Sequence, residues 1–164
     1  MPASTEATGP RILIVDDQSS NVRLLEHTLR RAGYVGVMST TDPCEVIALH
    51  LQHRYDLILL DLQMPEMDGF AVLAQLQKIR PSHPVAVLVI SAGDGQMTTA
   101  LESGGDSFLA KPFRIPDVVE RVGQMLKRGG DAVTASRASD GDSALGVTPA
   151  GFATNRSSDP PEGT

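Results

Sequence analysis

Two short runs of this sequence are almost entirely apolar, and they limit the possible folds more than any other feature. The runs are Tyr55–Asp61 and Val85–Ser91. A strand that is apolar at nearly every position must be covered on both faces, which is typical of parallel sheets with helices on either side. Segments with helical spacing of apolar residues lie between such runs. The pattern therefore predicts an α/β protein.

Strand-like runs alternate with helical periods along most of the chain. The expected strands are Arg11–Asp16, Tyr34–Ser39, Tyr55–Asp61, Val85–Ser91 and Ser107–Ala110. The expected helices begin near Asn21, Asp42, Asp68, Thr98 and Ile115. Five such β-α units predict a doubly wound five-stranded parallel sheet, and right-handed crossovers place helices on both of its faces. At the second helix we expect Asp42 to cap, Pro43 to occupy the first helical position and Glu45 to complete a capping box.

The composition changes after Arg128. Residues 129–164 are rich in Gly, Ser, Asp, Ala, Thr and Pro and have no periodic apolar stripe. Such a segment cannot bury enough apolar surface to offset the entropy lost on ordering. We therefore expect a flexible N-terminus over residues 1–10, a folded domain over residues 11–128 and a disordered tail over residues 129–164.

Charge and composition exclude several classes of function. The net charge of −6 and pI near 5.1 argue against nucleic acid as a partner. One cysteine, Cys44, permits neither an internal disulfide nor a cysteine-based metal site. No apolar run approaches the roughly 20 residues of a membrane span, and the first ten residues do not resemble a signal peptide. These features predict a soluble cytoplasmic protein without membrane partners.

Charged and hydroxyl residues stand where the expected strands end. They are Asp16, Asp17, Asp61, Ser91 and Lys111. The carboxyl ends of parallel strands share one edge of the sheet, and ligands bind there. Three carboxylates and one ammonium group are therefore expected to converge. That combination suits a hard divalent cation such as Mg²⁺ together with a phosphoryl group.

Each of these residues also has an ordinary explanation when it is taken alone. The two adjacent aspartates can cap the following helix, Asp61 can end a strand at a turn, and Lys111 can be a solvated surface lysine. Their shared edge favours the chemical interpretation, because Asp61 can attack a phosphoryl group and Lys111 can attract its oxygens. Ser91 is either a turn residue or a hydrogen-bond donor to the same group. Pro112 follows Lys111, and an X-Pro bond at such a position can be cis.

These segments resemble the receiver domain of two-component response regulators over about residues 11–128. The matching motifs are Ile12-Leu-Ile-Val-Asp-Asp17, Leu59-Leu-Asp-Leu-Gln-Met-Pro-Glu-Met-Asp-Gly69, Val89-Ile-Ser-Ala92 and Asp106-Ser-Phe-Leu-Ala-Lys-Pro-Phe113. The resemblance implies the flavodoxin-like (βα)5 fold, in which a histidine kinase or a histidine phosphotransfer protein donates a phosphoryl group.

The roles of individual residues follow from the same resemblance. It implies that Asp61 is the phosphoacceptor, and that Mg²⁺ is bound by Asp17 and Asp61, with Asp16 nearby and the backbone carbonyl of Gln63 as a further ligand. Ser91 and Lys111 hold the phosphoryl oxygens. Phe108 takes the position of the aromatic residue that moves when such receivers switch. The alternative is that Phe108 is an ordinary core ring.

The chain departs from the family pattern at Gly105, which replaces a common alanine, and in the length of one segment. The stretch from Ser91 to Lys111 is shorter than in most receivers, which puts the partner-binding face in doubt. That stretch, with Asn21-Val-Arg-Leu-Leu-Glu26, is similar to receivers that precede HD-GYP-type phosphodiesterases, but no such output domain is present in this sequence. His50 and His53 are three positions apart on an expected helix and are interpreted as surface polar residues, not metal ligands.

Three functions remain open at this point. The leading hypothesis is a stand-alone, single-domain response regulator, not an enzyme, that binds another protein or passes phosphate along a relay. An aspartate-nucleophile phosphatase is disfavoured, because Asp61-Leu-Gln63 lacks the second carboxylate that would act as acid and base. A receiver-like adaptor that does not switch is the third possibility.

Overall fold

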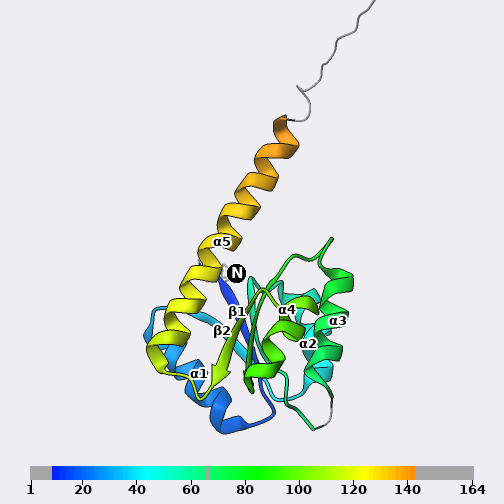
Figure 1. Ribbon diagram of the computed structural model, residues 1–164. Coiled ribbons are helices and arrows are strands. Elements are labelled where there is room, and N and C mark those ends of the chain that lie inside the picture. Colours follow the sequence, from blue (N-terminus) through cyan, green and yellow to red (C-terminus); the bar gives the residue numbers. More distant parts are fainter. Residues whose placement is uncertain (1–8, 66, 143–164) are drawn as a thin grey trace, which may run out of the picture. The chain divides into compact units, whose positions relative to one another are not determined.

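The sheet is parallel, as the apolar runs indicate. The computed structural model describes residues 9–65 and 67–142, with five strands in the order β2-β1-β3-β4-β5 (Figure 1). The strands are β1 (Arg11–Val15), β2 (Gly36–Thr40), β3 (Leu57–Asp61), β4 (Ala86–Ala92) and β5 (Ser107–Lys111). Every neighbouring pair is parallel. The expected five-stranded, doubly wound fold is confirmed, with strand ends displaced by at most two residues.

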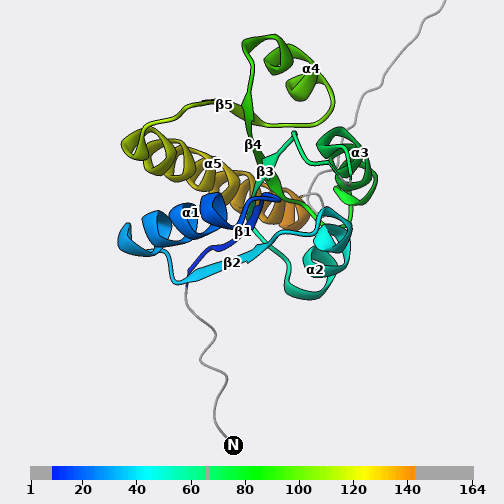
Figure 2. The same ribbon diagram turned by 90° about the horizontal axis from the view of Figure 1, so that it is seen from below.

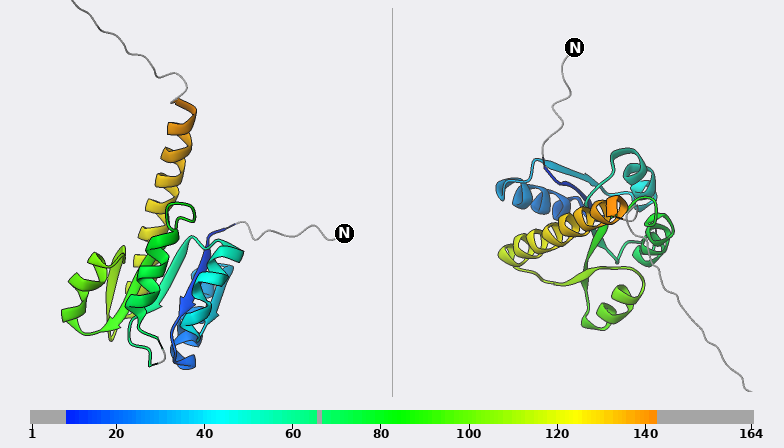
Figure 3. Two further views of the ribbon diagram at one scale, coloured as in Figure 1. Left: turned by 90° about the vertical axis from the view of Figure 1, so that its right-hand side faces the viewer. Right: turned by 90° about the horizontal axis from the view of Figure 1, so that it is seen from above.

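Helices cover both faces of the sheet. They are α1 (Ser19–Arg31), α2 (Val46–His53), α3 (Gly69–Ile79), α4 (Met97–Glu102) and α5 (Ile115–Asp142), with short 3-10 turns η1 (Pro43–Glu45) and η2 (Asp94–Gln96). Figure 2 shows α1 and α5 on one face and α2, α3 and α4 on the other. The right panel of Figure 3 shows the same layers from above. The crossovers are therefore of the kind that a doubly wound sheet requires.

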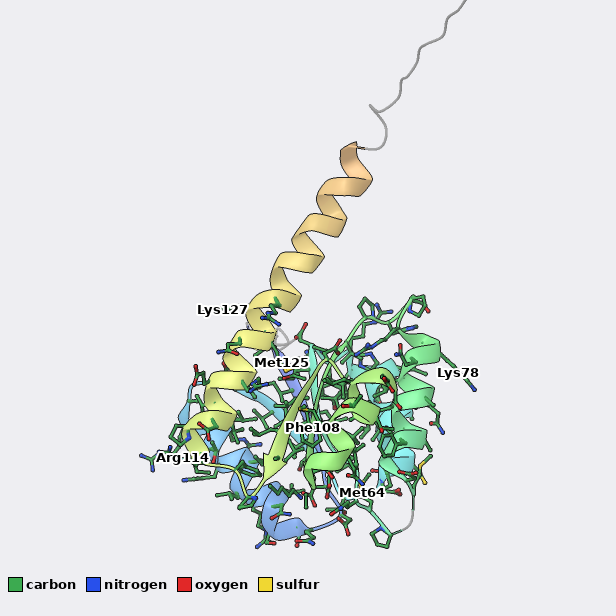
Figure 4. The ribbon with its side chains drawn as sticks, viewed as in Figure 1. Met64, Lys78, Phe108, Arg114, Met125 and Lys127 are labelled. Atoms are coloured by element: carbon green, nitrogen blue, oxygen red, sulfur yellow. The ribbon has the colours of Figure 1, made fainter. Side chains whose placement is uncertain are left out.

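The central strand β3 is buried along its whole length, and its side chains alternate between two cores. Ile58 and Leu60 pack with α2 and α3, whereas Leu57 and Leu59 pack with α1 and α5. Each fully buried aliphatic side chain contributes roughly 1.5–3 kcal/mol relative to exposure. Met125, labelled in Figure 4, belongs to the core on the α1–α5 face. The two cores together fix the positions of the strands, and so of the polar residues at the carboxyl ends of those strands.

The expected cap at Asp42 is present, but the capping box is not. The Asp42 side chain accepts a hydrogen bond from the backbone N–H of Cys44 at 2.9 Å. Glu45 instead accepts from the hydroxyl of Thr40 at 2.8 Å. The prediction for Glu45 was wrong because the backbone N–H of Asp42, which a capping box would use, already donates to the Thr40 hydroxyl at 3.0 Å.

His50 is buried, with 1% of its surface exposed, so its interpretation as a surface residue was wrong. Its Nδ1 accepts from the backbone N–H of Tyr55 at 3.1 Å, and its Nε2 lies 3.1 Å from the carbonyl oxygen of His83. Because Nδ1 is an acceptor, the proton of the neutral ring is on Nε2 and is donated to His83. The ring therefore joins the end of α2 to the segments that precede β3 and β4. Burial lowers the pKa of His50 below its usual value.

Helix α5 continues to Asp142, beyond the end expected at Arg128. No proline interrupts residues 117–142, so the helical backbone can continue past Arg128 without a break. The structure describes residues 129–142 as helical where the sequence analysis expects disorder, and residues 143–164 lie outside the described part of the chain. The compact unit that holds the sheet ends at Gly129. Within the described residues, none of the helices has both the length and the hydropathy of a membrane span.

Candidate functional site

The strand register brings three of the predicted residues to one side of the sheet edge. Asp16 follows β1 directly, Asp61 ends β3, and Lys111 ends β5. Side chains alternate along a strand. Each of the three polar residues comes two positions after a side chain that faces α1 and α5, and therefore projects to that same face. The preceding side chains are Ile14, Leu59 and Leu109. Parallel pairing of the strands therefore makes these polar groups neighbours although they are far apart in sequence.

Lys111 contacts both aspartates. Its Nζ donates to Oδ2 of Asp61 at 3.3 Å and to Oδ2 of Asp16 at 3.4 Å, and about a fifth of its side chain is exposed. The solvated-surface interpretation of this lysine is therefore excluded. The peptide bond from Lys111 to Pro112 is cis. One ammonium group thus faces two buried carboxylates at the end of the sheet.

The Asp61 carboxylate is buried and held at both oxygens. Oδ1 accepts from the backbone N–H of Gln63 at 3.0 Å, and Oδ2 accepts from Lys111. Burial raises the pKa of the Asp61 carboxyl above its usual value; the Gln63 N–H and the charge of Lys111 act against this rise, and the charge of Asp16 adds to it. Burial therefore makes the ionised form of Asp61 dependent on nearby positive charge and hydrogen-bond donors.

Asp16 has become part of the loop that starts α1, although it does not cap the helix. Its Oδ1 accepts from the backbone N–H of Gln18 at 2.9 Å, and its Oδ2 accepts from the side chain of Asn21 at 3.1 Å. Gln18 occupies the cap position; its side chain makes no capping bond to the helix backbone but accepts from the side-chain amide of Asn21 at 3.3 Å. The sequence did not single out Asn21 for this contact. Its amide holds the Asp16 carboxylate in place from the first turn of α1.

Asp17 supplies the observation that favours a cation. Its Oδ1 is buried and has no hydrogen-bond partner among the residues that the structure describes. Carboxylate oxygens of Asp16, Asp17 and Asp61 lie within 4.8 Å of one another. Opposite oxygen ligands of a Mg²⁺ ion lie about 4.2 Å apart, twice the usual bond length. A buried charged oxygen without a partner is costly, so a hard cation fits this donor set.

Ser91 and Phe108 lie on the other face of the same edge. Ser91 comes two positions after Val89 on β4, and Phe108 pairs with Val89 from β5. All three side chains therefore project to the face that is covered by α2, α3 and α4. The Ser91 hydroxyl is fully buried and donates to Oε1 of Gln96 at 2.8 Å. Phe108 is half-buried against this core, on β5 (Figure 4). Sequence reasoning did not identify Gln96, because nothing in its spacing sets it apart from other polar residues.

Gln63 links the loop that follows β3 to the last residue of β4. Its side-chain amide donates to the carbonyl oxygen of Ala92 at 3.1 Å. The side chain at this position is therefore an amide that lies across the edge, without the carboxylate that an aspartate-nucleophile phosphatase would need two residues after Asp61. The site as a whole combines a buried carboxylate, the ammonium group of Lys111 and a cluster of carboxylate oxygens.

Comparison with known proteins agrees with this arrangement. The family model of the response regulator receiver domain matches residues 12–149. The chain belongs to the response regulator receiver family. Its sheet order and helices are those of the CheY-like, flavodoxin-like receiver fold, so the recognition made from the sequence motifs is confirmed.

Curated relatives of this receiver are longer proteins. Transcriptional regulatory protein PrrA of Mycobacterium tuberculosis is 36% identical over 132 residues, which cover 80% of this chain and 56% of the relative. The alkaline phosphatase synthesis transcriptional regulatory protein PhoP of Bacillus subtilis is 34% identical over 126 residues, covering 77% and 52%. The receiver chain spans about half the length of the curated relatives it matches.

Solved receiver structures agree over nearly their whole length. A CheY-like receiver domain protein from Methanospirillum hungatei has a TM-score of 0.69 at 25% identity, covering 76% of this receiver chain and 99% of that one. The Francisella response regulator 1452 receiver domain has a TM-score of 0.66 at 29% identity, covering 73% and 98%. The receiver fold is thus shared by proteins of similar extent.

Proposed function

We propose that this receiver accepts a phosphoryl group on Asp61 and thereby changes its affinity for a partner protein. The observation that carries the proposal is the contact of Lys111 with both Asp61 and Asp16, beside an Asp17 oxygen that has no hydrogen-bond partner in the described part of the chain. A buried ion pair of this kind contributes little to stability by comparison with apolar packing, so a functional reason for it is favoured. The family to which the chain belongs supports the same conclusion.

Phosphoryl transfer asks little covalent chemistry of the protein. In the proposed step, a carboxylate oxygen of Asp61 attacks phosphorus, the bond from phosphorus to the donor nitrogen of a phosphohistidine breaks, and the histidine nitrogen keeps the electron pair and is protonated. Because charge spreads over the phosphoryl oxygens as this happens, positioning and charge neutralisation supply most of the catalysis. The Gln63 N–H orients the Asp61 carboxylate. Lys111, already 3.3 Å from it, is placed to attract the incoming oxygens.

The proposed metal ligands are carboxylate oxygens of Asp17 and Asp61, with Asp16 beside them and the backbone carbonyl of Gln63 completing the protein's share. When bound, Mg²⁺ would offset the negative charge that accumulates where an anionic phosphoryl group meets these carboxylates. Two observations support this assignment: Oδ1 of Asp17 has no hydrogen-bond partner among the described residues, and oxygens of the three aspartates lie within 4.8 Å of one another.

The proposed response lies on the face that holds Ser91 and Phe108. A phosphoryl group on Asp61 adds negative charge and new acceptor oxygens, which favour a conformation in which the Ser91 hydroxyl donates to it. Phe108 then repacks behind Ser91, and the surface of α4, β5 and α5 changes. The half-buried state of Phe108 is compatible with such movement.

The partners follow from this chemistry. We propose that a sensor histidine kinase or a histidine phosphotransfer protein supplies the phosphoryl group, and that the receiver acts as a signalling module on another protein and not as a turnover enzyme. The cytoplasmic location and the lack of nucleic-acid binding expected from the sequence stay predictions.

The test is intact-mass measurement after incubation with a small phosphodonor and Mg²⁺. Wild type should gain one phosphoryl group, Asp61→Asn should gain none, and omission of Mg²⁺ should block the gain without unfolding the chain. Asp42→Asn is the matched control, because Asp42 also follows a strand but caps η1 and lies outside the oxygen cluster. Labelling of Asp61→Asn at the wild-type level would refute the proposal. A partner captured equally by wild type and Asp61→Asn would indicate a non-switching adaptor.

A further inference from the structure

We propose that Gln96 competes with the phosphoryl group for the hydroxyl of Ser91, and so acts as a positioning residue that opposes the switched state. The inference rests on the proposed function of Asp61 as phosphoacceptor. It assigns to Gln96 a role that follows from its contact with Ser91 and from its place at the start of α4.

The competition arises because a serine hydroxyl has one hydrogen to donate. In this structure Ser91 donates it to Oε1 of Gln96 at 2.8 Å, and the residue is fully buried. Ser91 follows Ile90, which pairs with Asp61 across β3 and β4. Ser91 therefore stands at the same end of the sheet as the phosphoacceptor, one residue beyond its pairing partner, with its hydroxyl engaged by Gln96. Donation to a phosphoryl oxygen requires the bond to Gln96 to break.

The position of Gln96 connects this bond to α4. Gln96 ends η2 and occupies the cap position directly before Met97, the first residue of α4. Its backbone N–H donates to the carbonyl oxygen of Gly93 at 3.3 Å, which closes the turn. The side-chain bond to Ser91 therefore ties the start of α4 to the end of β4. Release of that bond on phosphorylation would free the start of α4 to take a second position.

The alternative is that Gln96 only stabilises the turn. If Gln96 acted only through contacts other than its bond to Ser91, its replacement would weaken η2 and α4, but the effect would not depend on whether Ser91 has a hydroxyl. Competition makes a different prediction, since the effect of Gln96 on phosphoryl-analogue binding must disappear when Ser91 is alanine. A double-mutant cycle separates the two.

The experiment measures the affinity of the full chain for beryllofluoride with Mg²⁺ by calorimetry. Gln96→Met keeps the length of the side chain and removes the acceptor, and should bind about two- to tenfold more tightly, the range expected for one neutral hydrogen bond. Gln96→Glu keeps an acceptor and should bind no more tightly than wild type. Gln52→Met, an exposed glutamine on α2, is the matched control and should match wild type. In a Ser91→Ala background, Gln96→Met should leave the affinity unchanged.

The possible failures can be told apart. Equal affinity in wild type and Gln96→Met, with binding observed, would overturn the competition and leave the phosphoacceptor proposal intact. A gain in Gln96→Met that persists in the Ser91→Ala background would also overturn it, in favour of a structural role. Binding in none of the variants, with the fold confirmed by circular dichroism, would refute both the phosphoacceptor proposal and the competition that rests on it.

Discussion

Replacing Gly69 by alanine should strain the contact between α3 and the strand that carries Asp61. Gly69 is the first residue of α3, and its backbone N–H donates to the carbonyl oxygen of Leu62 at 3.3 Å. A Cβ atom at this position would lie 2.5 Å from Cα of Leu62 and 2.8 Å from the backbone oxygen of Asp61. Both neighbours are backbone atoms that follow or belong to the candidate nucleophile, so side-chain rotation cannot relieve the overlap.

The magnitude follows from this geometry. The closest approach is about 0.9 Å short of ordinary contact, which begins at 3.4 Å. Forcing extra volume into a packed region typically costs about 1–3 kcal/mol. The first helical residue recovers little of the roughly 1 kcal/mol by which alanine exceeds glycine inside a helix. We therefore expect Gly69→Ala to lower the free energy of unfolding by about 1–3 kcal/mol.

Gly123→Ala is the matched control, since it makes the same chemical change within α5. There a Cβ atom would lie 3.7 Å from the hydroxyl oxygen of Tyr34, an ordinary contact. Helix propensity then dominates, and the free energy of unfolding should rise by roughly 0.5–1 kcal/mol. Urea denaturation followed by circular dichroism measures both changes. At the size of this domain, 1 kcal/mol corresponds to roughly 4 °C in the melting temperature.

The reasoning depends on opposite signs for the two variants. Gly69→Ala should also slow phosphoryl labelling at temperatures at which it is still folded, because α3 can move away only by displacing the backbone that positions Asp61. If Gly69→Ala were as stable as Gly123→Ala and labelled at the wild-type rate, the close packing of α3 on Leu62 would be refuted.

Three further predictions concern the buried polar groups. The pKa of His50 is lowered in the folded state, so the unfolded state binds the proton first and the free energy of unfolding should fall as the pH drops below about 6.5. His50→Asn should reduce this pH dependence in urea titrations between pH 7.5 and 5.5, and an unchanged slope would contradict the prediction. The pKa of Asp61 is raised in the folded state, so ionisation of this carboxyl lowers the stability of the fold. Asp61→Asn should therefore melt a few degrees higher than wild type at pH 7 in the presence of chelator. A lower melting temperature would show that the contact of Asp61 with Lys111 outweighs the cost of burial. Mg²⁺ should raise the melting temperature of wild type but much less that of Asp17→Asn, and an equal rise in both would exclude Asp17 as a ligand.

The fold could be predicted because its main signals are local. Runs such as Leu57–Leu60 are apolar on both faces, and only a strand between two helical layers satisfies them. Errors occurred where a local pattern had competing partners. The Glu45 side chain binds Thr40 in place of its expected capping partner, and His50 binds backbone groups of the segments that precede β3 and β4.

The sequence could predict which residues form the candidate site, but not which of them hydrogen-bond to one another. Strand ends mark Asp61 and Lys111, because residues there meet at one edge of any parallel sheet. The bond from Ser91 to Gln96 and the bond from Asn21 to Asp16 depend on how loops return to that edge. Nothing in the spacing of those amides distinguishes them from surface residues.

The amino-acid sequence was enough to determine the architecture and the identity of the polar residues at the sheet edge. Apolar runs, helical periods and acidic residues at strand ends are patterns that extend over a few residues, so they can be read without the fold. Tertiary structure alone decided which of these groups touch. Lys111 reaches both Asp16 and Asp61 while one oxygen of Asp17 stays without a hydrogen-bond partner among the described residues. These outcomes depend on register, side-chain parity and burial, which are fixed only when strands distant in sequence pair with one another.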